Sequence, residues 1–203
     1  MILNKRKIIA IVVVAIIIIT SGSFIILYRP VVSLADRMLI HSGDLEPGWR
    51  EVSRRALTYP ANDPDFLNLT SAECVVMNRN SSYMVAYIFV FNSSEDCHQR
   101  FEEGSYLYAL AFDVQDVAIG DVGFIMKAPP GLGANAYFGI VANNISYQID
   151  PSRFVGMMFI QDNVMAYMDV FEQGESQVDQ AWLTTFILSV GAVQLERINH
   201  HLL

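Results

Sequence analysis

The sequence predicts an α+β fold: an antiparallel sheet packed by two helices, preceded by an N-terminal transmembrane helix. Three observations predict it. Short apolar runs are separated by turn residues, two segments carry helix-capping residues, and no alternating strand–helix–strand pattern is present. Runs of strands with only two helices favour a sheet covered by helices on one face.

The strands follow from alternating apolar residues and from the turns between them. The run 83–91 is apolar at both alternating positions, which predicts a central strand. Asn143 and Asn144 indicate one hairpin, because asparagine tolerates a positive φ, and Gln161–Asn163 indicate a second. The expected strands cover residues 49–56, 73–78, 83–91, 114–119, 122–128, 136–142, 145–149, 153–160 and 164–171.

Two long helices are expected. Ser93, with Asp96 three residues later, marks the start of the first, and one of its faces carries Cys97, Phe101, Gly104 and Tyr108. Ser176 and Asp179 cap the second, over about 175–198, whose apolar stripe includes Val178, Trp182, Phe186, Val190 and Val193.

The N-terminal segment predicts a membrane anchor. Residues 8–28 hold 21 positions without a charge, and such a helix is about 31 Å long, enough to cross a hydrocarbon core of about 30 Å. Lys5, Arg6 and Lys7 predict a cytoplasmic N-terminus. A cleaved signal peptide, cut near Ser21–Ser23, is the competing interpretation. The run resumes at Phe24, and this length favours an uncleaved anchor.

The expected organisation is a cytoplasmic stub (1–7), the anchor (8–28), a stalk or short helix (29–42) and an exported α+β domain (43–203) in the cell membrane. From residue 36 onward the chain has nine basic and 21 acidic residues, a net charge of −12. So acidic a body would repel a phosphate backbone, which excludes nucleic-acid binding.

Cysteines and sequons both fit an exported domain. Cys74 and Cys97 are the only cysteines, and an oxidising compartment would favour a disulfide between them; the alternative is two unpaired buried thiols. Asparagines in glycosylation sequons stand at Asn68, Asn80, Asn92 and Asn144.

Residues for catalysis or metal binding are sparse. The sequence has no nucleophile motif beside a histidine, so no catalytic residue is assigned, and an exported hydrolase remains only a further alternative. Asp113, Asp116 and Asp121 are the candidate calcium ligands, because calcium prefers hard oxygen ligands, although their spacing does not match an EF-hand. No other cofactor is expected.

A binding surface is the remaining candidate. Tyrosine and methionine side chains concentrate in the predicted hairpins, where they pack a core or, on an uncovered sheet face, form an apolar patch for a partner or an apolar ligand. The candidate binding residues are Tyr137, Tyr147, Met157, Met165 and Tyr167.

Four stretches also carry a resemblance: 38–49 (MLIHSGDLEPGW), 83–103, 119–124 (IGDVGF) and the final hairpin with its helix. Their order resembles that of small exported prokaryotic domains, lipoprotein or membrane-anchored, with a PsbP/Mog1-like or sensor-domain fold. The resemblance implies a non-enzymatic binding or accessory module, with a possible protein partner in a membrane complex. The alternative is a calcium-dependent cell-surface or envelope module.

Overall fold

The computed structural model describes residues 32–59, 68–129, 138–142, 145–174 and 179–202. The predicted anchor, 8–28, lies outside these residues. Among the helices that are described, none has both the length and the apolar character needed to cross a membrane. The part of the chain from Ser33 to Leu203 forms one compact unit.

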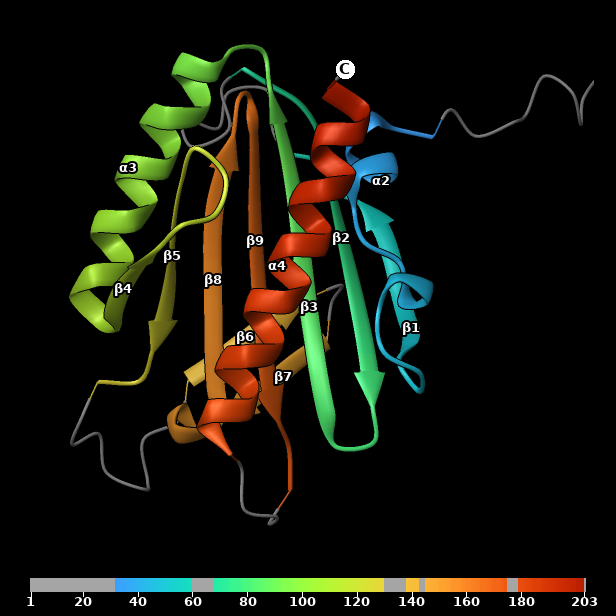
Figure 1. Cartoon of the computed structure of the whole chain (residues 1–203), viewed down its shortest axis with the longest axis vertical. Coiled ribbons are helices and arrows are strands. Elements are labelled where there is room, and N and C mark those ends of the chain that lie inside the picture. Colours follow the sequence, from blue (N-terminus) through green and yellow to red (C-terminus); the bar gives the residue numbers. More distant parts are fainter. Residues whose placement is uncertain (1–31, 60–67, 130–137, 143–144, 175–178, 203) are drawn as a thin grey trace, which may run out of the picture. The chain divides into compact units, whose positions relative to one another are not determined.

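A seven-stranded antiparallel sheet is the centre of this unit (Figure 1). Its order is β1-β2-β3-β9-β8-β5-β4, so the C-terminal hairpin β8–β9 lies between the strands β1–β2–β3 and the hairpin β4–β5. The strands are β1 (Arg50–Ala56), β2 (Leu69–Arg79), β3 (Ser82–Phe91), β4 (Asp113–Val117), β5 (Val122–Lys127), β8 (Phe154–Gln161) and β9 (Val164–Glu172). The predicted α+β class is confirmed. The strands β6 (Phe138–Ala142) and β7 (Ile145–Ile149) pair in a separate two-stranded sheet.

Tight turns set the register of the two central hairpins. Asn80 and Asp162 have φ values of 55° and 54°, which short polar residues tolerate better than other side chains. The β4–β5 turn requires glycine at position 120. Its φ is 61°, and a Cβ there would lie 2.2 Å from the Ile160 carbonyl oxygen.

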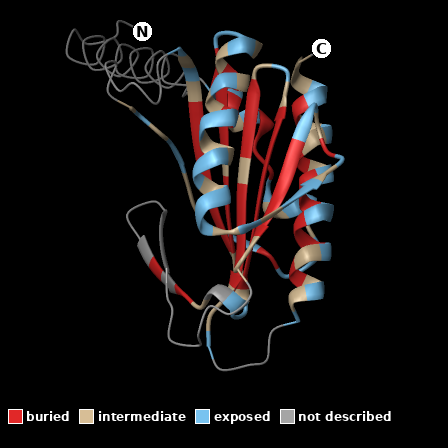
Figure 2. Ribbon diagram, turned by 90° about the vertical axis from the view of Figure 1, so that its left-hand side faces the viewer, coloured by how far each residue is buried: buried red, intermediate tan, exposed pale blue. Residues whose placement is uncertain are grey.

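Helices cover both faces of the sheet (Figure 2). The helices α2 (Leu34–Met38) and α4 (Gln180–Leu202) pack on one side, called the α4 face, and α3 (Ser94–Ala111) packs on the other, called the α3 face. The predicted packing by two helices on one face is therefore wrong. The physical reason is that the central strands are apolar at both alternating positions, so each face needs a cover.

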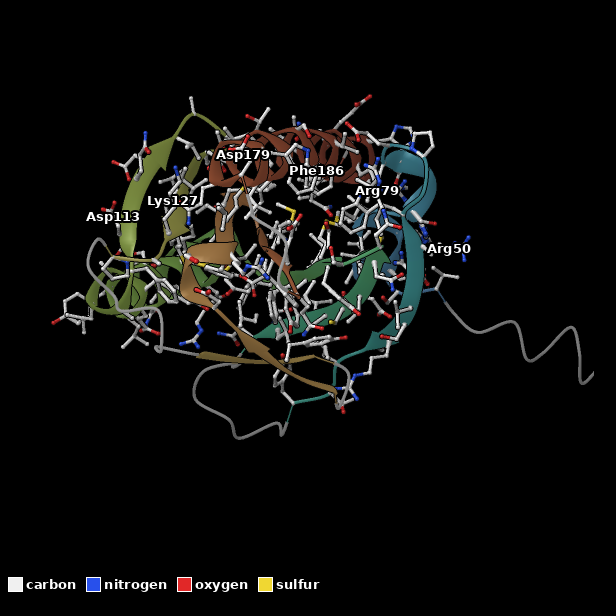
Figure 3. All side chains as sticks on the ribbon, turned by 90° about the horizontal axis from the view of Figure 1, so that it is seen from below. Arg50, Arg79, Asp113, Lys127, Asp179 and Phe186 are labelled. Atoms are coloured by element: carbon white, nitrogen blue, oxygen red, sulfur yellow. The ribbon has the colours of Figure 1, made fainter. Side chains whose placement is uncertain are left out.

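The α4 face is an aliphatic core with one aromatic stack. Phe186 points from α4 toward the sheet (Figure 3), and its ring stacks on Trp49 and Trp182 at centroid distances of 5.0 and 5.3 Å. The Gln194 side chain accepts a hydrogen bond from the Ile40 N–H at 3.1 Å and donates one to the Met38 carbonyl at 2.6 Å. These bonds hold the segment after α2 against α4.

Part of the segment expected to be a stalk, residues 29–42, belongs to the hydrophobic core of the domain. Ala35, Met38, Leu39 and Ile40 are fully buried, and Ser33 caps α2 by accepting a hydrogen bond from the Asp36 N–H at 3.0 Å. Residues 33–40 therefore pack into the domain that was expected to begin at residue 43.

Candidate functional site

A buried carboxyl group lies in the middle of the α3 face. Asp169 is on β9, opposite Val85 of β3 and Gly156 of β8. Its residue surface is 1% exposed, and Oδ1 has no hydrogen-bond partner. Because burial disfavours the charged form, the pKa of Asp169 rises to about 7, although a hydrogen bond from Tyr167 opposes the shift. A buried unpartnered oxygen is costly, so this group needs a functional explanation.

Gly156 makes room for this carboxyl. A Cβ at position 156 would lie 2.7 Å from Cε of Met126, 2.9 Å from Cζ of Phe154 and 3.0 Å from Oδ1 of Asp169. Any larger residue would have to displace the carboxyl or the two side chains beside it.

Tyrosines connect the carboxyl to α3. The Tyr167 hydroxyl donates a hydrogen bond to Asp169 and is also hydrogen-bonded to the Tyr108 hydroxyl of α3. The Tyr108 and Tyr167 rings stack with centroids 5.6 Å apart. Tyr87 of β3 lies against Tyr167 at 5.7 Å and is hydrogen-bonded to the Cys74 thiol. We call Asp169, Tyr167, Tyr108 and Tyr87 the tyrosine–aspartate cluster.

Burial suppresses ionisation of the phenols in this cluster. It raises the pKa of Tyr167 well above the usual tyrosine value, and it raises the pKa values of Tyr108 and Tyr87 as well. The phenols are therefore neutral at physiological pH, and the group that can change its charge near neutrality is Asp169.

The β6–β7 sheet closes part of the same face. Tyr147 of β7 is 6% exposed, and its ring lies 5.4 Å from Tyr83 and 5.3 Å from Phe171. Figure 3 shows β6 and β7 on the side of the main sheet away from α4. The α3 face is thus covered by α3 near Tyr108 and by β7 near Tyr147.

The outward face of α3 carries exposed apolar side chains. Tyr106, Leu107 and Leu110 are 67%, 60% and 70% exposed, and their spacing places them on one side of the helix. Glu103 extends the same row by one turn and is also exposed. We call Glu103, Tyr106, Leu107 and Leu110 the α3 stripe; its outward side is pale blue in Figure 2.

A second polar cluster near α2 is structural. The Arg54 guanidinium contacts Asp36 and Glu51, each at 3.0 Å, and donates to the Ile40 carbonyl at 2.7 Å. Because these charges are paired, the cluster ties β1 to α2 and offers no unpartnered group.

The candidate calcium ligands are not brought together. Asp113 and Asp116 are exposed on β4, whereas Asp121 lies in the next turn and accepts a hydrogen bond from the Asp162 N–H at 2.6 Å. Within the described ranges, no three His, Cys, Asp or Glu side chains are placed to hold a metal ion. The geometry gives the calcium hypothesis no support.

The candidate binding residues lie on different faces. Tyr147, Met165 and Tyr167 pack on the α3 face, whereas Met157 is buried on the α4 face. Tyr137 lies outside the described residues. Both faces of the sheet are covered, so the described members of this set do not form an exposed apolar patch. The exposed apolar side chains in a row lie on α3 instead.

Cys74 and Cys97 are both buried free thiols. Cys74 lies in β2 against Tyr87. Cys97 lies in the first turns of α3, where the charges of Asp121 and Asp162 add to the rise of its pKa that burial causes. Burial raises the pKa of each thiol to about 12, so neither is a nucleophile at neutral pH. The predicted disulfide is not formed in this structure, which instead shows two buried thiols.

Three of the four sequon asparagines are exposed: Asn68, Asn80 and Asn92. The Asn68 side-chain amide donates to Asp96 at 2.8 Å, and the Asn92 amide oxygen accepts from Thr70 at 2.8 Å. Asn144 lies outside the described residues. Glycosylation stays a prediction.

No protein-family model matches the chain, and no curated protein is significantly similar to it in sequence. In fold it is similar to the extracellular domain of PknH from Mycobacterium tuberculosis, with a TM-score of 0.47 and 8% identity over 82% of this chain and 94% of that one. It is also similar to a putative uncharacterized protein from Mycobacterium smegmatis, with a TM-score of 0.39 and 10% identity over 82% and 98%. Likenesses of this degree concern the arrangement of helices and strands, so residue roles come from this chain's own geometry.

Proposed function

We propose that this chain is a membrane-anchored extracytoplasmic domain without catalytic activity, and that it binds a protein partner through the α3 stripe. The observation that carries the proposal is the exposure of Tyr106, Leu107 and Leu110 on a helix whose opposite side is seated on the sheet. Contiguous exposed apolar side chains of this kind mark interaction surfaces.

Charge defines the partner. Glu103 lies in the stripe, where it pairs with Arg100 at 3.3 Å, and Glu102 lies beside it without such a pair in the described structure. Both are exposed, and the chain from residue 36 onward carries a net charge of −12. The matching surface is an apolar patch bordered by basic residues, because opposite potentials favour association. An anionic lipid surface would instead repel so acidic a domain.

The membrane location rests on the sequence. The uncharged run 8–28 and the basic residues Lys5–Lys7 favour an anchored domain on the far side of the membrane. A single anchor suits an accessory subunit that acts beside larger membrane proteins.

The experiment is site-directed photo-crosslinking of the full-length protein in native membranes. A photoreactive residue at position 107 should crosslink one protein in stoichiometric yield, whereas the same residue at position 188 should not. Leu188 is the matched control, since it is exposed (38%) on α4. The double variant Leu107→Glu/Leu110→Glu should lose the partner, and Leu188→Glu should keep it.

Salt and charge reversal sharpen the test. The captured partner should dissociate as ionic strength rises, and Glu102→Lys/Glu103→Lys should weaken capture by about tenfold. Crosslinking to lipid, to a second copy of the chain, or equally from positions 107 and 188 would contradict the proposal.

A further inference from the structure

We propose that the protonation state of Asp169 regulates the docking surface on α3 through the hydrogen bonds of Tyr167 and Tyr108. The inference rests on the proposed function of the α3 stripe and concerns how docking there is regulated. The protonated carboxyl keeps the last turn of α3 seated on the sheet. The ionised carboxyl loosens it.

The geometry around the carboxyl makes the ionised form unfavourable in the closed structure. Asp169 is 1% exposed and its Oδ1 has no partner, so a negative charge there would have neither water nor a donor on that oxygen. Its nearest neighbours across the sheet, Val85 and Gly156, offer no polar side chain.

The groups that face Asp169 from the surrounding elements are phenols, thioethers and rings. Among the described residues, the causes of its shifted pKa are burial, which raises the pKa, and the Tyr167 hydrogen bond, which lowers it; no described cation is among them. The polar or titratable neighbours in the cluster and around it are Tyr167 on β9, Tyr87 on β3, Cys74 on β2, Tyr108 on α3 and Tyr147 on β7, with Arg100 acting on Tyr108. Asp169 alone among these changes charge near pH 7.

The connection to the surface is short. Tyr108 is next to Leu107 and two residues from Leu110, in the last turns of α3, which ends at the cap residue Phe112. Phe112 packs on Phe154 at 5.6 Å, and Phe154 lies beside Gly156. When Asp169 ionises, water can reach the carboxyl by displacing Tyr108, and this movement would shift the residues of the stripe.

The direction with pH follows from the pKa of Asp169, which burial raises to about 7. Near pH 6 about nine-tenths of the carboxyl is protonated and α3 is seated. Near pH 8 about nine-tenths would be ionised, so the open form is about tenfold more populated.

Amide hydrogen exchange of the purified full-length protein in detergent tests this without a partner. After correction for intrinsic exchange, amides 108–112 should lose about tenfold in protection between pH 6 and pH 8. At each pH they should remain less protected than amides 183–198 of α4, which open only when the whole domain unfolds. Asp169→Asn, which cannot ionise, should abolish the difference. Asp116→Asn, an exposed aspartate on β4, should leave it intact.

A second variant separates regulation from simple destabilisation. Tyr167→Phe removes the hydrogen bond that lowers the pKa of Asp169, so the midpoint of the exchange transition should move to higher pH. Unchanged protection of amides 108–112 between pH 6 and pH 8 would overturn the switch. A pH-dependent helix with pH-independent crosslinking at position 107 would overturn its link to docking, whereas loss of crosslinking at every pH would count against the docking surface itself.

Discussion

Both faces of the sheet are covered by a long helix, but the side chains buried under the two helices differ in kind. The α4 face is mainly aliphatic, with one stack of three rings and the ring of Phe159, and the two ends of its buried amide, Gln194, both form hydrogen bonds. The α3 face is lined by tyrosine and phenylalanine and holds the carboxyl of Asp169. Among the described residues, three buried side-chain polar atoms have no hydrogen-bond partner: Trp49 Nε1 and Arg197 Nε on the α4 side, and Asp169 Oδ1 on the α3 face. The Arg197 guanidinium still binds Asp44 and the Arg37 carbonyl through its other nitrogens, whereas the unpartnered atom of Asp169 belongs to a carboxyl group that is 1% exposed.

This difference sets a face that serves stability apart from the face on which we propose that a partner docks. The helix α4 adds bonds and contacts that a stable domain needs, and Leu188 is the one large apolar side chain on it that is markedly exposed among the described residues. The helix α3 instead keeps three large apolar side chains in solvent and covers an ionisable group. The exposed apolar side chains and the buried carboxyl, both of which cost stability, therefore lie on the α3 side.

The largest loss should come from the α4 face. Phe186→Ala removes the ring between Trp49 and Trp182 and should destabilise the domain by about 3–5 kcal/mol, since it deletes a buried aromatic side chain. Urea unfolding measures this. Phe186→Leu, which keeps most of the buried volume, should cost less than half as much. Equal losses for the two variants would mean that ring stacking, and not buried volume, supplies most of the stability.

The pH dependence of stability should come from the α3 face. Because the folded pKa of Asp169 is raised to about 7, the folded state binds a proton that the unfolded state releases near pH 4. The contribution of Asp169 to the free energy of unfolding is therefore fully present below pH 4. It is lost as pH rises through 7, and the loss amounts to up to about 4 kcal/mol. Unfolding of Asp169→Asn should be flatter between pH 5 and pH 8. A residual slope of the same sign is expected from Glu73, whose pKa burial also raises.

An intermediate effect is expected at the link between α2 and α4. Gln194→Ala leaves the Ile40 N–H and the Met38 carbonyl without their partner and should cost about 2 kcal/mol. Chemical unfolding at pH 6 checks this. Gln99→Ala, at an exposed position on α3, is the control and should change stability by less than about 0.5 kcal/mol.

The smallest change in stability should accompany the largest change in binding. Leu107→Glu/Leu110→Glu replaces exposed side chains, so the free energy of unfolding should shift by less than about 0.5 kcal/mol. A loss above 2 kcal/mol would show that these leucines are part of the folded core, and the crosslinking result would then have to be read as a loss of folding.

Local sequence patterns predicted most of the helices and strands, because caps, turns and alternation depend on residues that are close in sequence. Ser93 caps α3 as expected: its hydroxyl oxygen accepts a hydrogen bond from the Asp96 N–H at 3.1 Å. The hairpin predicted from 153–160 and 164–171 is the observed β8–β9 hairpin. The role of residues 33–40 could not be predicted, because their burial depends on Gln194, more than 150 residues later.

The sequence analysis named Tyr167 but missed the buried carboxyl of Asp169, although the sequence carries a signal for it. Asp169 stands inside the apolar run VMAYMDVF, at a position that alternation assigns to a buried face. A charged residue there predicts either an unusual partner or a neutral acid. The choice between them needs the cross-strand neighbours Val85 of β3 and Gly156 of β8, which the run itself does not reveal.

The edges of the main sheet have a consequence for solubility. Figure 3 shows Asp113 and Arg50 at opposite edges, on β4 and β1, each of which pairs with only one neighbour in the sheet. An open edge can recruit a strand from another molecule and start aggregation, and charged side chains on short edge strands oppose this. Asp113 and Asp116 on the five-residue β4 thus have a use that requires no metal, because their charges oppose the edge-to-edge pairing of two copies of this chain.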